Sequence, residues 1–189
     1  MNGRSTPSQT VGPYFSIGFS WLGRNDLTGG TAGGKRVTIR GRVLDGEGQP
    51  VPDAVLEIWQ ADADGRYAHP EDAGELVATK GFFGFGRVSV NDQGEFRFTT
   101  IKPGSVSGPA GTPQAPHLEV SLFMRGLLRR LVTRIYFPDE SANDTDAILG
   151  SVPAPRRHTL IAQPIAGEAE TFVWDVHLQG DQETVFFDY

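Results

Sequence analysis

The sequence contains no cysteine, and it is short of positive charge. Without cysteine the chain can form no disulfide, offers no thiolate nucleophile and cannot hold zinc on sulfur, so any metal ligands must be nitrogen or oxygen atoms. The 17 Lys and Arg residues are outnumbered by 23 Asp and Glu residues, for a net charge of -6. Because nucleic-acid binding depends on clustered basic residues that displace counterions, we expect no nucleic-acid partner.

Long hydrophobic runs are missing as well. The first nine residues are polar, and no apolar segment of signal-peptide or membrane-span length follows them. We therefore expect a cytoplasmic protein with no membrane partner. The 189 residues suffice for one domain, and the 24 glycines and 13 prolines indicate many turns and long loops.

Apolar residues recur at every second position from residue 36 onward. Val37, Ile39 and Val43 alternate with polar neighbours, which is typical of a strand with one buried face. Further short strands are expected at 54–59, 87–90, 96–100, 118–123, 131–137, 172–178 and 184–187. Short strands separated by polar turns predict an all-β fold, a single β-sandwich spanning residues 36–189.

Few residues favour a helix. The one candidate covers residues 140–149, with Asp144 or Thr145 as its N-cap. Residues 101–116 are rich in glycine and proline and are expected to form a long loop.

Residues 1–35 are expected to form an extended N-terminal arm. Pro7 and Pro13 oppose a helix, and residues 29–34 are mostly glycine. The arm nevertheless carries much apolar surface, in Tyr14, Phe15, Ile17, Phe19, Trp21 and Leu22. Surface of this kind is rarely left in water, so we expect the arm to pack on something.

Three residues could ligate a metal ion. His117 and Glu119 stand two apart on an expected strand, so their side chains leave the same face about 7 Å apart. Tyr67 could add a phenolate oxygen, a hard ligand that suits ferric iron. Each residue also has an ordinary structural explanation, as a strand-edge His, a solvated Glu and a half-buried loop Tyr. The residues alone leave both interpretations open.

Basic residues gather after this strand, in Arg125, Arg129, Arg130 and Arg134. They are either surface charges paired with carboxylates or part of an interface or anion site. In the second case the planar fork of a guanidinium would suit a carboxylate.

Several separated motifs resemble the intradiol ring-cleavage dioxygenases. They are TPSQTVGPYF at residues 6–15, LEIWQAD at 56–62, IKPG at 101–104, APHLEVSLF at 115–123 and ETVFFDY at 183–189. The resemblance implies a β-sandwich of the intradiol dioxygenase type. It also implies O2-dependent cleavage of a catechol in chains that hold one non-haem Fe(III) with two Tyr and two His.

The chain departs from this ligand pattern. Tyr67 matches the first tyrosine ligand and His117 the first histidine, but Glu119 stands where the family has its second histidine. The second tyrosine is absent, since residues 105–108 read SVSG, and Gln114 replaces an expected arginine. The resemblance therefore implies vestigial ligand positions, no catalytic residue in this chain alone, and Fe(III) bound by a partner chain.

By the same resemblance, this chain completes the substrate pocket of the iron-bearing partner. The matching substrate-binding positions are Thr10, Gly12, Pro13 and Tyr14 in the arm, together with Arg125. The implied partners are that second chain, in a higher-order oligomer of both chains, and a small aromatic substrate with O2. The arm of residues 1–35 would then pack on the partner chain.

Two other hypotheses remain. One is a homomeric intradiol dioxygenase whose altered iron site uses Tyr67, His117 and Glu119. The other is a non-enzymatic, transthyretin-like binding sandwich, because the turn pattern around residues 41–54 also occurs in such modules.

Overall fold

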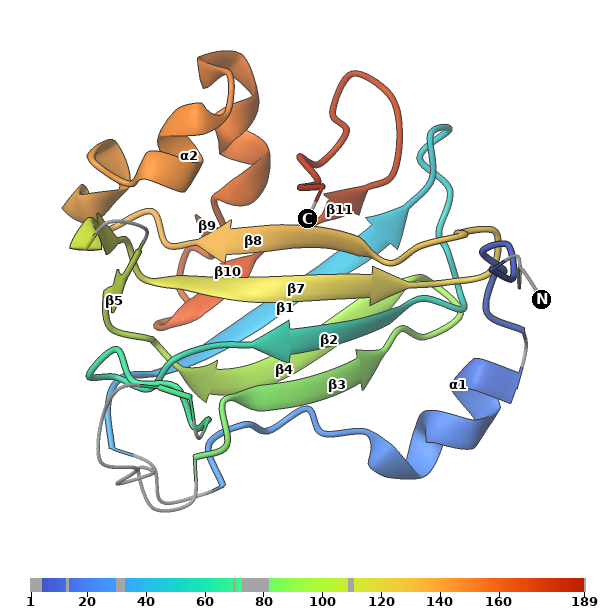
Figure 1. The fold of residues 1–189 in the computed structure, drawn as a ribbon, viewed down its shortest axis with the longest axis horizontal. Helices are drawn as coiled ribbons and strands as arrows, with labels where there is room; N and C mark the ends of the chain where they lie inside the picture. Colours follow the sequence, from blue (N-terminus) through green and yellow to red (C-terminus); the bar gives the residue numbers. More distant parts are fainter. Residues whose placement is uncertain are drawn as a thin grey trace.

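The structure is a computed structural model that describes residues 5–12, 14–29, 33–69, 71–72, 82–108 and 111–188. Two open sheets face each other as a β-sandwich (Figure 1), which confirms the expected fold class. The first sheet contains β1 (Arg36–Leu44), β4 (Glu95–Ile101), β9 (Gln163–Pro164), β10 (Thr171–Val173) and β11 (Val176–His177). The second contains β3 (Phe85–Ser89), β2 (Val55–Trp59), β7 (His117–Phe123) and β8 (Leu131–Tyr136), in that order.

The core lies between these sheets. In β1 the predicted alternation is confirmed, because Val37 and Ile39 are buried while Arg40 and Arg42 are exposed. Fully buried side chains from both sheets pack together, among them Ile39, Ile58, Phe98, Leu118 and Ile135. Burial of an aliphatic or aromatic side chain contributes roughly 1.5–3 kcal/mol, so this layer holds the two sheets together.

Two polar turns connect strands as the sequence predicts. The Oδ1 atom of Asp45 accepts hydrogen bonds from the backbone N–H groups of Glu47 and Gln49. Asn91 makes the same pattern after β3, with the N–H groups of Gln93 and Glu95. Such side-chain acceptors stabilise a turn before the next strand begins.

The C-terminal strands are shorter than the periodicity predicts. The expected strand at 172–178 is two pieces, β10 and β11, which both pair parallel to β1. Between them the backbone N–H of Trp174 still donates to the carbonyl of Arg40. The N–H of Arg42 instead donates to the side chain of Asp175 at 2.8 Å, which interrupts the backbone ladder. The strand expected at 184–187 is wrong, since Phe187 makes only an isolated bridge to Val132.

The helical segments also differ from expectation. The candidate at 140–149 consists of η3 (Ser141–Asp144) and α2 (Ala147–Ser151). The N-cap of α2 is Asp146, not Asp144 or Thr145, and its side chain accepts from the N–H of Leu149 at 2.8 Å. Residues 101–116 contain the short strands β5 (Val106–Ser107) and β6 (Pro113–Gln114).

Among the described residues, three further helical segments were not predicted. They are α1 (Tyr14–Phe19), η1 (Ser20–Leu22) and η4 (Ala154–Leu160). In the sequence α1 follows a proline directly, and η4 has a proline at its start. Proline opposes the interior of a helix but is favoured in its first turn, so these prolines mark helix starts. Among the described residues, no helix is both long and apolar enough to cross a membrane.

The arm divides into two parts. Arg24 pairs with Arg87 of β3, and the N–H of Leu27 donates to the carbonyl of Thr99 in β4, so residues 24–28 join the two sheets at their open edges. Gly86 makes room for this segment, because a Cβ there would lie 2.5 Å from Leu27 Cδ1. The earlier residues Tyr14, Ile17 and Trp21 are instead exposed.

Substituting Leu27→Ala should destabilise the fold by about 2–5 kcal/mol, because Leu27 is 0% exposed and the change leaves a cavity in the core. Chemical denaturation of the full chain measures this loss. The matched control Leu128→Ala removes the same atoms from a side chain that is 62% exposed, and a change within about 0.5 kcal/mol is expected. Equal losses for both variants would show that residues 24–28 are not part of the core.

Candidate functional site

The three vestigial ligand positions meet on the outer face of the second sheet, at the start of β7. His117 and Glu119 point away from the core because Leu118 between them is buried in it. The strand register places His117 opposite Tyr136 and Glu119 opposite Arg134. These four side chains therefore share one end of the sheet face, as alternation requires.

Tyr67 reaches the same place from the loop after β2. Asp62 Oδ1 accepts from the N–H groups of Asp64 and Arg66, and Gly65 supplies the positive φ of 79° that this turn needs. The ring of Tyr67 then stacks on Trp59, with ring centroids 5.8 Å apart and planes 9° from parallel. The fold thus places Tyr67 close to His117 and Glu119, as the sequence suggested.

Arg134 lies among these residues and is only 8% exposed. Its Nη1 donates to Gln114 Oε1 at 2.7 Å and to the hydroxyl of Tyr136 at 3.5 Å. The basic group that the sequence suggested is therefore divided. Arg134 is buried on β8, whereas Arg125, Arg129 and Arg130 are exposed in the β7–β8 connection.

Burial and the charge of Arg134 control the protonation of this pocket. Desolvation, assisted by the nearby guanidinium, lowers the pKa of His117 from 6.5 to about 4. The Nδ1–H of the neutral ring donates to the carbonyl of Ala115 at 2.7 Å. Burial raises the pKa of Tyr67 and of Tyr136, so both phenols keep their protons at neutral pH.

These residues do not fit a ferric ion. Only Tyr67 and His117 match the two Tyr and two His of the family, since Glu119 stands in place of the second histidine and residues 105–108 contain no tyrosine. Within the described part of the chain, no three His, Cys, Asp or Glu side chains gather closely enough to hold a metal.

A second group of predicted residues lies at the other end of β7. Arg125 Nε contacts Asp53 Oδ2 at 2.5 Å, and the backbone N–H of Gly126 donates to Thr10 Oγ1 at 2.8 Å. The fold therefore brings Thr10 and Arg125 together from distant segments. Tyr14, which follows Thr10 in the arm, is 79% exposed. Gly12 accepts from the N–H of Phe15 at the start of α1, and Pro13 lies outside the described residues.

The two groups are too far apart to share one ligand. Strand β7 has 7 residues, and at ~3.3 Å per residue its ends lie about 20 Å apart. Figure 1 shows the start of β7 beside β5 at one side of the molecule and its end near the N-terminal arm at the other. Whatever Arg125 contacts is therefore not held by Tyr67, His117 or Glu119 of the same chain.

The surface around Arg125 has the character of an interface. A hollow of about 200 Å³ lies between arm and connection, lined by Gln9, Val11, Phe123, Met124, Leu127, Leu128, Arg129 and Arg130. Nearby in sequence, the exposed fractions of Tyr14, Ile17, Trp21 and Leu128 are 79%, 66%, 77% and 62%. Large exposed apolar side chains of this kind mark interaction surfaces.

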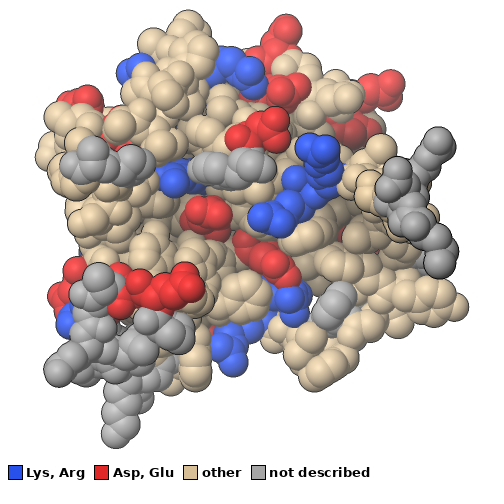
Figure 2. All heavy atoms as spheres, in the orientation of Figure 1, with Lys and Arg blue, Asp and Glu red and all other residues tan. Residues whose placement is uncertain are grey.

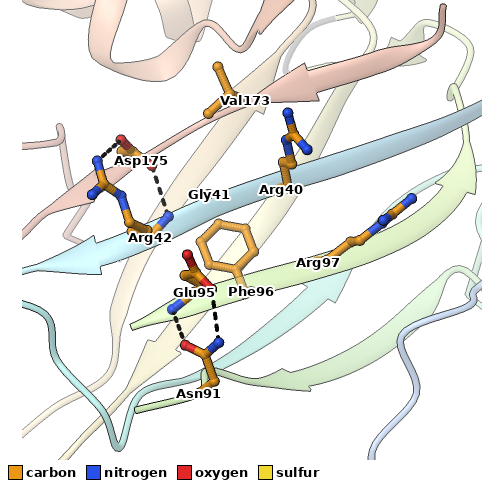
Figure 3. A pocket seen from close by; sticks show the side chains of 9 residues that line it. All are labelled: Arg40, Gly41, Arg42, Asn91, Glu95, Phe96, Arg97, Val173 and Asp175. Carbon is orange, nitrogen blue, oxygen red and sulfur yellow. Dashed lines mark hydrogen bonds and ion pairs between the residues drawn. The ribbon is translucent and has the colours of Figure 1, made fainter. Parts of the chain in front are cut away.

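Another hollow belongs to the first sheet. It measures about 480 Å³ and is lined by charged residues of β1, β4 and the β10–β11 link (Figure 3). Its charges largely compensate one another, as in the ion pairs of Arg42 with Asp175 and of Arg40 with Glu168. On the other sheet, acidic and basic side chains are similarly interspersed (Figure 2). On neither of these two faces do the charged side chains form a patch of a single sign.

Sequence reasoning missed two members of these groups. Asp53 and Tyr136 carry no motif, and their contacts depend on strand register and on the β7–β8 connection. Arg134 offered a signal, because it is the one charged residue in the strand of residues 131–136. A charged residue at such a position needs partners if it is buried.

Lowering the pH should reduce the stability of the fold through His117. The folded protein favours the neutral ring, with a pKa of about 4, whereas the unfolded chain has the ordinary value of 6.5. This contribution is full above pH 6.5 and disappears as the pH falls through 4. Between pH 7 and pH 5 the free energy of unfolding should fall by about 2 kcal/mol more in the native chain than in His117→Gln. Urea denaturation at both pH values tests this, and equal pH dependence in both proteins would contradict it.

Sequence comparison agrees with the fold. The family described as Dioxygenase matches residues 12–180. The chain is 42% identical to the protocatechuate 3,4-dioxygenase alpha chain of Pseudomonas putida, over 97% of this chain and 96% of the relative. The alpha chain of Burkholderia cepacia is 41% identical, over 98% of both chains. The beta chain of Burkholderia cepacia is 36% identical, over 86% of this chain and 72% of that relative.

Solved structures show the same fold. The dioxygenase domain of a carbohydrate-binding fusion protein from Streptomyces sp. SirexAA-E superposes with a TM-score of 0.63 at 24% identity, covering 98% of this chain and 96% of that one. With the motifs, the fold and the family match in agreement, this chain belongs to the intradiol ring-cleavage dioxygenase family.

Proposed function

We propose that this chain is the alpha subunit of a protocatechuate 3,4-dioxygenase and completes the active site of an iron-bearing beta chain. The reaction would join protocatechuate and O2 to give 3-carboxy-cis,cis-muconate, a step of the beta-ketoadipate route. One ring bond between the hydroxylated carbons breaks, and both oxygen atoms enter the product. Members of the family depend on non-haem iron, and both alpha and beta chains are among the relatives of this chain.

The observation that carries the proposal is the separation of the two groups on β7. Arg125 and Thr10 form one end of the molecule, about 20 Å from the vestigial ligands. The vestigial pocket does not fit a ferric ion, and it encloses the guanidinium of Arg134. A catechol bound beside Arg125 therefore needs iron from a second chain, which favours the two-chain enzyme over a homomeric one with an altered site.

The arm provides the docking surface in this proposal. Residues 1–35 would pack on the beta chain through Tyr14, Ile17 and Trp21, while residues 24–28 stay on the sandwich of residues 36–189. Thr10, Gly12, Pro13 and Tyr14 would then line the substrate pocket. A purely non-enzymatic sandwich would explain neither this exposed apolar surface nor the family match.

Arg125 would bind the ring carboxylate of protocatechuate. Asp53 engages its Nε and, at 3.3 Å, its backbone N–H, which fixes the side chain while the Nη groups of the fork remain suited to a second carboxylate. In the single chain the Arg125 side chain is 62% exposed. A beta chain docked over it would exclude water and strengthen the interaction with the substrate.

Iron should be found in the two-chain complex and not in this chain alone. We expect the protein co-expressed with a beta chain to show ferric tyrosinate colour and to cleave protocatechuate. The alpha chain purified by itself should be colourless and inactive, because its own ligand set does not fit iron. Metal analysis and absorption spectra of both preparations test this, and stoichiometric iron in the isolated chain would refute it.

Substituting Arg125→Ala in the complex should weaken protocatechuate binding roughly ten- to hundredfold, the worth of a charge-assisted hydrogen bond of about 1.5–3 kcal/mol. Catechol lacks the carboxylate, so its affinity should change much less. Titration of both ligands measures the difference. Arg97→Ala is the control, because Arg97 lies on the outer face of the first sheet and should leave both affinities unchanged. Equal losses of both ligands in Arg125→Ala would exclude the carboxylate contact.

A further inference from the structure

We propose that Asp53 is a positioning residue that determines substrate preference. It holds the side chain of Arg125 ready for a ring carboxylate, so that the pocket prefers catechols that carry one. This inference deepens the proposed function and rests on it, because Arg125 binds the substrate only in the complex with a beta chain. The contacts that support the role of Asp53 lie within this chain.

The register of β2 with β7 brings the two residues together. Val55 pairs with Phe123, so the antiparallel strands, continued two residues beyond this pair, set Asp53 opposite Arg125. Opposite charges at facing positions attract each other. Asp53 Oδ2 accepts from Arg125 Nε at 2.5 Å and from its backbone N–H at 3.3 Å. The contact thus follows from the pairing of two strands that also form the core.

The two partners differ in how firmly they are held. The Asp53 side chain is 21% exposed, and the next residue, Ala54, is buried in the core. The Arg125 side chain is 62% exposed. Its backbone is tied to the arm, because the N–H of Gly126 donates to Thr10 Oγ1 at 2.8 Å. Asp53 therefore supplies what the backbone contact does not, a fixed direction for the guanidinium.

A carboxylate beside Arg125 has two opposite effects on the binding of a second carboxylate. It lowers the local positive charge, which weakens the attraction for an anionic substrate. It also orders a long side chain before the substrate arrives, which removes an entropic cost of binding. The geometry favours the second effect, because Asp53 engages Nε and no described residue occupies the Nη groups. The outer edge of the fork stays available for a bidentate contact.

Asp53 also balances the charge of Arg125 in the ligand-free complex. A beta chain docked over Arg125 would withdraw the guanidinium from water, and a buried charge without a partner is costly. Catechol has no carboxylate, so it gains nothing from a guanidinium held in place. We therefore expect Asp53 to act on the KM of carboxylate-bearing substrates and to leave the ring chemistry unchanged.

The test measures KM and kcat of the complex with protocatechuate and with catechol. Asp53→Ala should raise the KM for protocatechuate roughly three- to tenfold, the cost of ordering one long side chain. The kcat and the KM for catechol should stay close to the native values. Asp53→Asn keeps an oxygen that accepts from Nε and should restore most of the native KM. In a chain that already carries Arg125→Ala, Asp53→Ala should add no further loss.

Asp175→Ala is the matched control. Asp175 likewise accepts from the backbone N–H and the guanidinium of one arginine, Arg42, and its side chain is 27% exposed. It lies beside β1 on the first sheet (Figure 3), so both substrates should keep their native KM.

The outcomes separate this role from the proposed function. A lower or unchanged KM for protocatechuate in Asp53→Ala, while Arg125→Ala is impaired, would overturn the positioning role and leave the proposed function intact. Additive losses in the double variant would overturn it as well. If Arg125→Ala itself leaves protocatechuate unaffected, the carboxylate contact fails, and the role of Asp53 fails with it.

A measurement on the native chain does not depend on whether any variant folds. In nitrogen relaxation spectra the Nε–H group of Arg125 should be ordered by its contact with Asp53. The same groups of Arg129 and Arg130, which are exposed in the same connection, should be mobile. Equal mobility of all three would contradict the proposal.

Discussion

The antiparallel pairing of β7 with β8 is the constraint on which the rest depends. Side-chain alternation sends Leu118 into the core and His117 and Glu119 outward, and the register sets Arg134 against Glu119. A shift of the register by one residue would move every one of these side chains to the opposite face. The length of the same strand separates the vestigial pocket from Arg125. The pairing of β7 with β8 thus positions both the vestigial ligand residues and the Arg125 side chain that a partner could contact.

The strands could be predicted wherever one face is buried. The alternation of apolar Val37 and Ile39 with charged Arg40 and Arg42 is an unambiguous strand pattern. The turns at Asp45 and Asn91 follow from local hydrogen bonding. The C-terminal strands were harder to predict, because a bond such as that from the Arg42 N–H to the Asp175 side chain depends on tertiary contacts that no local pattern encodes. The prediction that proline opposes a helix in the arm failed for a different reason, since the effect of proline depends on whether it stands at the start of a helix or inside it.

The candidate site was predictable in its members and not in its arrangement. Tyr67, His117 and Glu119 do come together, and Thr10 does meet the Arg125 loop. Yet the four arginines that are close in sequence are separated in the fold. Arg134 is buried on β8, whereas the other three are exposed in the β7–β8 connection. The roles of Asp53 and Tyr136 needed the register and the connection geometry, which a single sequence leaves open.

The segment at residues 24–28 has a consequence for solubility. Strand β3 ends one sheet and β4 ends the other, and an uncovered strand edge can recruit the edge of a second molecule. Arg24 and Leu27 occupy the hydrogen-bonding groups of both edges at once. One short stretch of the arm therefore shields two templates for aggregation, and a chain truncated beyond residue 28 would expose both of them.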